Sequence, residues 1–216
     1  MATRPERLVL VVGTGTEVGK TWVTCRLVAA LRRRGLRVSA RKPVQSYGTD
    51  GDIGATDAEL LADATGEPVG TVCPLHRWYP RAMAPPMAAE ALGRPPWRVS
   101  DLVAEMSWPS AVSVGLVEAA GGVRSPMAAD GDAVALAEAL HPEHVVLVAD
   151  AGLGTLNGIR LSAPALDRWP MTVVLNRYEA NDELHRRNWQ WLAERYGFEV
   201  VADPADLVAP IVGWPT

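Results

Sequence analysis

The chain has 216 residues and a formal net charge of −4 at pH 7, so we expect one domain spanning residues 1–216 with a substantial buried core. This acidic balance disfavours a nucleic-acid-binding protein held by a broad basic surface. The first residues lack the apolar core of a signal peptide and no apolar run approaches the ~20 residues that cross a bilayer, so we expect a cytoplasmic protein without a membrane partner.

The first predicted element is an apolar strand at residues 8–12, followed at residues 13–21 by Gly-Thr-Gly-Thr-Glu-Val-Gly-Lys-Thr. Glycines let backbone N–H groups approach phosphate oxygens closely, and the start of the next helix adds unpaired N–H groups. Lys20 can reach the β- and γ-phosphates, while the hydroxyl of Thr21 can bind Mg²⁺. Thr14 stands where the standard phosphate-loop pattern has its first glycine, so the stretch predicts a variant phosphate loop.

A dinucleotide-binding turn is an alternative for the same glycines, which follow the pattern Gly-x-Gly-x-x-x-Gly. Such a site usually has an acidic residue at the end of the second strand, whereas the strand predicted here ends in Arg41-Lys42-Pro43. Basic residues could hold the 2′-phosphate of NADP, so the glycines alone leave this alternative open. The Gly-Lys-Thr triplet between a strand and a helix favours the phosphate loop.

The remaining chain alternates predicted strands and helices, which is typical of an α/β fold with a mainly parallel sheet and helices on both faces. Residues 74–97 hold six prolines and fit an ordered excursion with one short helix at 87–92. Glu118 follows an apolar strand at the edge where open α/β sheets place their sites, so we expect it to be functional. The other expected elements are helices at 20–34, from 56 and at 182–197, and strands at 36–44, 112–117, 144–150 and 171–175.

Four spaced motifs resemble those of dethiobiotin synthetase, a family of P-loop NTPase type. They are the glycine-rich loop, Arg-Lys-Pro-Val at 41–44, Val-Glu-Ala-Ala-Gly-Gly at 117–122 and Leu-Gly-Thr-Leu-Asn at 153–157. The resemblance implies a homodimeric, ATP-dependent cyclo-ligase of biotin biosynthesis that joins CO₂ to 7,8-diaminopelargonic acid. It further implies a carbamate and then a carbamic-phosphoric anhydride as intermediates, with Mg²⁺ as cofactor and ATP, or another nucleotide such as CTP, as co-substrate.

The resemblance also assigns roles to residues at the matching positions. It implies catalytic roles for Lys20, Lys42, Thr16 and Glu17, and a Mg²⁺ site formed by Thr21, Asp57 and Glu118. The nucleotide would contact Gly15, Thr16, Glu17, Val18, Gly19, Lys20, Thr21, Trp22, Glu118 and Asn176. The diamine substrate would contact Lys42, Ser46, Gly121 and Gly122 and, across a dimer interface, Leu153, Gly154, Thr155 and Asn157.

The chain departs from the family pattern at three positions. Gly15 stands where the loop commonly carries Asp, Ala119 replaces a glycine, and Pro86 stands where many members have histidine. Two other functions therefore stay open: a partitioning or assembly ATPase of the related P-loop group, and a catalytically weakened nucleotide-binding relative. The assembly ATPases generally begin the loop with Lys-Gly-Gly, whereas this chain has Val-Gly-Thr at 12–14.

Overall fold

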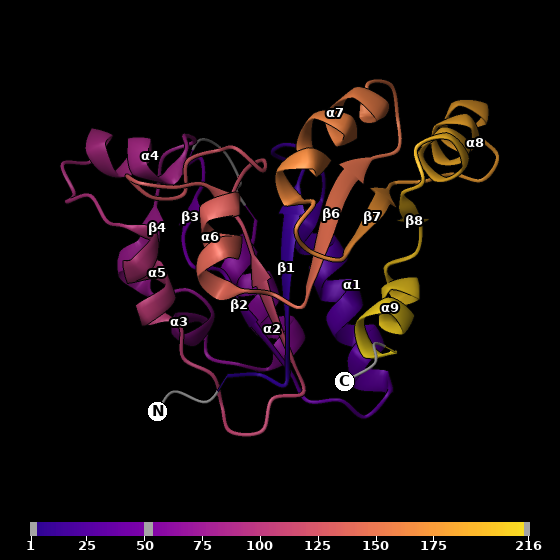
Figure 1. Ribbon diagram of the computed structural model, residues 1–216. Coiled ribbons are helices and arrows are strands. Elements are labelled where there is room, and N and C mark those ends of the chain that lie inside the picture. Colours follow the sequence, from indigo (N-terminus) through magenta and orange to yellow (C-terminus); the bar gives the residue numbers. More distant parts are fainter. Residues whose placement is uncertain (1–3, 50–53, 214–216) are drawn as a thin grey trace.

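The computed structural model describes residues 4–49 and 54–213, and its centre is a parallel β-sheet (Figure 1). Within those residues the six strands follow the order β2-β5-β1-β6-β7-β8, and every neighbouring pair is parallel. The strands are β1 (Arg7–Gly13), β2 (Val38–Arg41), β5 (Val114–Glu118), β6 (His144–Asp150), β7 (Met171–Asn176) and β8 (Glu199–Val201). The predicted α/β class with a mainly parallel sheet is confirmed.

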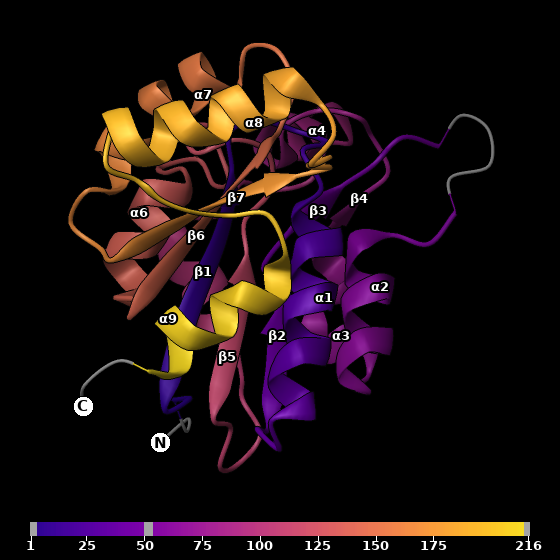
Figure 2. The ribbon, with the colours of Figure 1, turned by 90° about the vertical axis from the view of Figure 1, so that its right-hand side faces the viewer.

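Helices cover both faces of this sheet. Figures 1 and 2 show α6 and α7 on one face and α1, α2 and α9 on the other. The helices are α1 (Lys20–Arg33), α2 (Asp57–Thr65), α3 (Val69–Val72), α4 (Pro85–Ala91), α5 (Val99–Glu105), α6 (Ala133–Leu140), α7 (Thr155–Ser162), α8 (Glu183–Gln190) and α9 (Val208–Val212). Among the described residues, no helix combines the length and the apolar character that a membrane crossing requires.

Strand β1 is buried on both faces, which explains its uninterrupted apolar sequence. Leu8, Leu10 and Val12 pack into the hydrophobic core on the side of α6 and α7. Val9 and Val11 point the other way, into the core shared with α1 and α2. Successive side chains of a strand point to opposite faces, so one run of five apolar residues contributes to both cores. The loop that follows β1 therefore starts from a rigid support.

The second predicted strand is shorter than expected. Residues 36–44 yield only β2, after which β3 (Gln45–Ser46) leaves the sheet and pairs with β4 (Trp78–Tyr79). Strand β8 was not predicted, because its three residues at the sheet edge are exposed or half-buried and form no long apolar run. Residues 50–53, between the strand predicted at 36–44 and the helix predicted from residue 56, lie outside the described residues.

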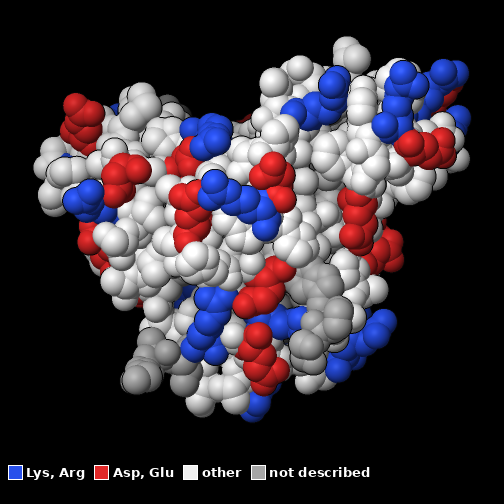
Figure 3. Space-filling model, in the orientation of Figure 1, with Lys and Arg blue, Asp and Glu red and all other residues white. Residues whose placement is uncertain are grey.

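The proline-rich segment is an ordered part of the structure, as predicted. Tyr79 and Trp97 are buried and stack with their ring centroids 5.1 Å apart. Helix α4 begins at Pro85, where a proline is tolerated because the first N–H groups of a helix have no intrahelical partner. On the surface, acidic and basic side chains are interspersed over the face shown in Figure 3.

Candidate active site

The phosphate loop connects β1 to α1 and is held in a conformation that requires glycine at one position. Gly19 has φ +91°, and a Cβ there would lie 2.0 Å from Nδ2 of Asn176. Glu17 also adopts the left-handed region, with φ +62°, which is uncommon for a residue with a side chain. The loop thus has the tight backbone path expected of a phosphate cradle.

Gly15 has room for a side chain, in contrast to Gly19. A Cβ at Gly15 would meet only Cγ1 of Val18, at 4.0 Å. The absence of the acidic residue that the family often has here is therefore not imposed by the packing of this loop. Instead, the backbone carbonyl of Gly15 accepts a hydrogen bond of 2.9 Å from Nζ of Lys20.

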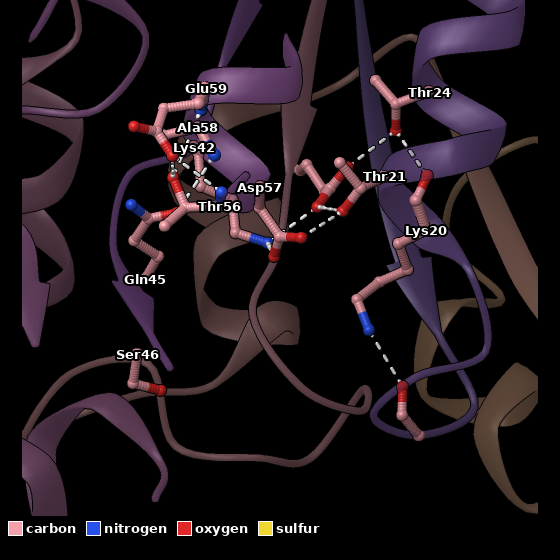
Figure 4. Close-up of polar contacts among 12 residues, drawn as sticks. Lys20, Thr21, Thr24, Lys42, Gln45, Ser46, Thr56, Asp57, Ala58 and Glu59 are labelled. Atoms are coloured by element: carbon pink, nitrogen blue, oxygen red, sulfur yellow. Dashed lines mark hydrogen bonds and ion pairs between the residues drawn. The ribbon is translucent and has the colours of Figure 1, made fainter. Parts of the chain in front are cut away.

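Thr21, Lys42 and Asp57 converge beside this loop (Figure 4). Glu118 contacts both Thr21 and Lys42 and completes the cluster. Nζ of Lys42 lies 2.7 Å from Oδ2 of Asp57 and 2.7 Å from Oε1 of Glu118. The hydroxyl of Thr21 lies 2.7 Å from Oδ1 of Asp57 and 2.8 Å from the same Glu118 oxygen. The ends of β2 and β5 and the starts of α1 and α2 therefore bring two carboxylates, a hydroxyl and an ammonium group into contact.

The local sequence explains how Asp57 reaches this cluster. Thr56 caps α2: its hydroxyl accepts from the backbone N–H of Glu59, and the Glu59 carboxylate accepts from the backbone N–H of Thr56. This capping box fixes where α2 begins. Asp57 is the first residue of the helix, so its side chain lies at the end that faces the phosphate loop.

The two lysines of the site have opposite electrostatic environments. Burial, followed by repulsion from Lys42, lowers the pKa of Lys20 to about 8. Burial also opposes the charge of Lys42, but attraction from Glu118 and Asp57 raises the pKa of Lys42 above its usual value. Burial would raise the pKa of Asp57, yet Lys42 and the hydrogen bonds of the cluster lower it below its usual range.

The oxygen atoms of Thr21, Asp57 and Glu118 form a set that fits a hard divalent cation. The Asp57 and Glu118 carboxylates lie close enough together to contact the same Lys42 ammonium group and the same Thr21 hydroxyl. No group of three or more His, Cys, Asp or Glu side chains suitable for a metal occurs in the described part of the chain. The cluster itself offers two carboxylates and one hydroxyl. Mg²⁺ suits such a site, because it prefers oxygen and usually retains water and phosphate ligands.

A cavity of about 880 Å³ opens over the phosphate loop and this cluster. Besides the loop and the cluster, its wall includes Tyr47, residues 82–85 and Ser125. Of the residues predicted for the site, those that line the cavity are Thr16, Glu17, Gly19, Lys20, Thr21, Lys42, Ser46, Asp57 and Gly121. Glu118 is fully buried and is bonded to Thr21 and Lys42.

Other predicted residues support the loop from behind. A Cβ on Gly122 would lie 3.4 Å from the carbonyl oxygen of Thr14, so this glycine packs against the loop backbone. Nδ2 of Asn176 donates a hydrogen bond of 2.9 Å to the carbonyl of Val18. Ala119, the position of the Gly-to-Ala departure, is 1% exposed and packs in the core below the site. Its methyl group therefore does not narrow the cavity.

Five predicted residues lie outside the phosphate loop, the cluster and the groups that support them, and they do not line the cavity. Trp22 is half-exposed on α1, with the Arg26 guanidinium 5.7 Å from its ring centroid. Leu153, Gly154, Thr155 and Asn157 lie at or just before the start of α7 and do not line the cavity of their own chain. Helix α7 nevertheless approaches the phosphate loop, since a Cβ on Gly158 would lie 3.5 Å from Cβ of Thr14.

Two contacts of the site were missed by sequence reasoning. Thr24 lies one helical turn beyond Lys20, and its hydroxyl is 2.9 Å from Oε2 of Glu118. Its position on the same face of α1 was a usable signal. Arg177 directly follows Asn176 and lines the cavity. No motif pointed to this arginine, because its partners come from distant parts of the sequence.

Comparisons with known proteins identify the family of the chain. A family model described as an AAA domain matches residues 7–203. The chain is 38% identical over 182 residues to the ATP-dependent dethiobiotin synthetase BioD of Anaeromyxobacter dehalogenans, covering 82% of this chain and 79% of that protein. It is 36% identical over 214 residues to the enzyme of the same name from Haloferax mediterranei, covering 93% and 88% respectively.

Among solved structures, the signal recognition particle receptor FtsY from Elizabethkingia anophelis has a TM-score of 0.54 at 14% identity. That match covers 92% of this chain but 58% of the receptor, and it supports the fold alone. The resemblance inferred from the four sequence motifs is confirmed by the sequence relatives. The chain belongs to the family of ATP-dependent dethiobiotin synthetases.

Proposed function

We propose that this protein catalyses the ATP-dependent formation of dethiobiotin from 7,8-diaminopelargonate and CO₂, a step of biotin biosynthesis. The observation that carries the proposal is the convergence of Lys20 and Lys42 with Thr21, Asp57 and Glu118 at one end of the cavity. This arrangement offers cationic groups for a transferring phosphoryl group and carboxylates for a divalent cation. The family membership supplies the substrate class.

The chemistry consists of three steps on the substrate. One amine of the diamine attacks CO₂ and loses a proton, which gives a carbamate. A carbamate oxygen then attacks the γ-phosphorus of ATP, and ADP leaves. The second amine attacks the carbonyl carbon of this mixed anhydride, so that the ring closes, phosphate departs and a proton is released.

The residues of the site suit these steps because negative charge builds up in each of the first two. Lys20 would bind the oxygens of the transferring phosphoryl group, and Lys42 would stabilise the carbamate and the anhydride. Thr21, Asp57 and Glu118 would hold Mg²⁺, which when bound neutralises charge on the β- and γ-phosphate oxygens. Thr16 and Glu17, both in the phosphate loop, line the cavity, and there they would face the amines of the diamine substrate.

We include a homodimer in the proposal. Leu153, just before α7, is 92% exposed and Leu161, on α7, is 73% exposed, so this region presents apolar side chains to its surroundings. The α7 residues that the family resemblance assigns to the substrate lie outside the cavity of their own chain. A second subunit that packs against this face would cover the leucines and supply those contacts.

The test is to incubate the purified protein with the diamine, ¹³C-bicarbonate, Mg²⁺ and either ATP or CTP, and to detect labelled dethiobiotin by mass spectrometry. We expect one labelled carbon in each product molecule and formation of ADP or CDP in equal amount. Nucleotide hydrolysis that ignores the diamine would contradict the proposal and would favour an assembly ATPase. Nucleotide binding without turnover would favour the weakened relative.

A further inference from the structure

Arg177 connects the phosphate loop to a second loop of the protein. The guanidinium donates a hydrogen bond of 2.8 Å from Nη2 to the backbone carbonyl of Glu17. Nη1 of the same guanidinium forms an ion pair of 2.7 Å with Oδ2 of Asp150, at the end of β6. The second Asp150 oxygen accepts a 2.9 Å hydrogen bond from the N–H of Gly152, so this carboxylate is held in place from both sides.

The phosphate loop receives two adjacent donors from the end of β7. Asn176 donates to the carbonyl of Val18, and Arg177 donates to the carbonyl of Glu17. In a trans peptide the N–H of the following residue points opposite to the carbonyl. The two hydrogen bonds therefore turn the N–H groups of Val18 and Gly19 away from β7, as an anion-binding loop requires.

This restraint acts where the loop backbone is least favourable. Glu17 has a left-handed φ of +62°, a conformation that costs about 1 kcal/mol or more in a residue with a Cβ. Arg177 itself has a φ of +58°. A conformation of this kind persists only where surrounding contacts stabilise it, and the Arg177 hydrogen bond is such a contact at the Glu17 carbonyl.

We propose that Arg177, held by Asp150, is a positioning residue that keeps the phosphate loop in its phosphate-binding conformation. The proposal deepens the proposed function, on which it rests for the identity of the nucleotide. Because Arg177 acts through the loop backbone, it affects the binding of the phosphates and not of the base. Asp150 contributes by orienting the guanidinium, since a side chain that is already hydrogen-bonded through Nη1 loses less conformational freedom when Nη2 donates to Glu17.

The experiment is isothermal titration calorimetry of Arg177→Gln, Arg177→Lys, Asp150→Asn and the double variant Arg177→Gln/Asp150→Asn. Each protein is titrated with ATP, CTP and inorganic triphosphate at the same excess of Mg²⁺ and without diamine. We expect Arg177→Gln to weaken binding about tenfold and by the same factor for all three ligands. Arg177→Lys should recover part of the loss, because one ammonium can still donate to the Glu17 carbonyl.

Asp150→Asn should weaken binding about threefold, and the double variant should be no weaker than Arg177→Gln alone, because the two residues act as one unit. In steady-state assays, Arg177→Gln should raise the KM for the nucleotide while kcat and the KM for the diamine stay within about twofold. Arg168→Gln is the matched control, since Arg168 forms an exposed ion pair with Glu138 away from the loop. That control should leave all affinities unchanged.

Three results would overturn the proposal. In the first, Arg177→Gln binds all three ligands within twofold of the wild type. In the second, the loss differs between ATP, CTP and triphosphate, which would assign Arg177 to the base. In the third, Asp150→Asn binds as tightly as the wild type while Arg177→Gln does not, which would indicate a direct contact with the nucleotide. Because no diamine is present, these results are independent of whether dethiobiotin is formed.

Discussion

The two sides of the candidate active site bury the same kind of residue in opposite ways. On the phosphate-loop side, Lys20 is 7% exposed and donates to the neutral carbonyl of Gly15, and burial lowers its pKa to about 8. On the β2 side, Lys42 is 2% exposed and lies between the carboxylates of Asp57 and Glu118, which raise its pKa despite burial. Two carboxylates therefore offset the cost of burying Lys42, whereas the hydrogen-bond acceptor of Lys20 is a neutral carbonyl.

This difference shows which part of the site depends on a ligand. On the Lys42 side, the protein itself supplies negative charge to the ammonium group, through Asp57 and Glu118. Within residues 4–49 and 54–213, no carboxylate is in hydrogen-bonding contact with the buried ammonium group of Lys20, and a bound phosphate would supply negative charge there. We therefore expect the Lys42 side to contribute to stability and the Lys20 side to reduce it in exchange for affinity.

The largest expected effect is that of Lys42→Met. This change leaves the fully buried Glu118 carboxylate without its cation, which should lower the free energy of unfolding by about 3–5 kcal/mol. Ring closure should be abolished, while nucleotide binding at the loop is largely retained. Urea denaturation measures the stability, and calorimetry measures nucleotide binding. A stability loss below about 1 kcal/mol would contradict the expected difference between the two lysines.

Thr24→Val should have a smaller effect on the same side. It removes the hydroxyl that lies 2.9 Å from Oε2 of Glu118 and should cost about 1–3 kcal/mol, because one oxygen of a buried carboxylate loses its donor. Thr24→Ser keeps the hydroxyl and is the control. Equal unfolding midpoints for the two variants in urea would show that this contact does not stabilise the Glu118 carboxylate.

Lys20→Met should act in the opposite direction. Removal of a buried ammonium whose pKa is lowered should raise the stability of the nucleotide-free protein by about 1–2 kcal/mol, while nucleotide affinity is lost. Methionine keeps most of the length of the side chain. Thermal unfolding of both lysine variants in one buffer gives the comparison directly, and a destabilised Lys20→Met protein would contradict it.

The smallest expected effect is a pH dependence of the nucleotide-free protein. The pKa of Lys20 is about 8 in the folded protein and near 10.5 in the unfolded chain, so the unfolded chain binds more protons between these values. The Lys20 contribution to the free energy of unfolding should therefore rise by about 1–2 kcal/mol between pH 8 and pH 10. Urea unfolding at several pH values, with Lys20→Met as the reference, isolates this contribution, and parallel curves would refute it.

Much of the fold could be predicted because its signals are local. The apolar runs that became β1, β5, β6 and β7 are long and continuous, as expected of strands buried on both faces. Strand β8 escaped prediction, because a three-residue strand at the sheet edge carries no such run. The tight path of Gly19 was also expected, since a phosphate loop needs glycine where backbone and ligand approach closely.

The candidate site was predictable in its residue types but not in its contacts. Lys42, Asp57 and Glu118 were assigned from motifs far apart in the sequence, and their roles remain predictions. Nothing in those motifs indicated that Lys42 lies between the two carboxylates. The contact of Thr24 with Glu118 could have been anticipated, because Thr24 lies one helical turn after Lys20 on α1. The contact of Arg177 with Glu17 could not, because the two residues are 160 positions apart in the sequence.

The family, the parallel α/β fold and the phosphate loop could be inferred from the amino-acid sequence, because they depend on short motifs and on the periodicity of apolar residues. The electrostatic environments of the two lysines became visible only in the folded chain. Lys20 donates to a carbonyl only 5 positions away, whereas Lys42 lies between carboxylates that are 15 and 76 positions away along the chain. Electrostatic interactions depend on distance in space and on burial, and both are set when the strands take their places in the sheet.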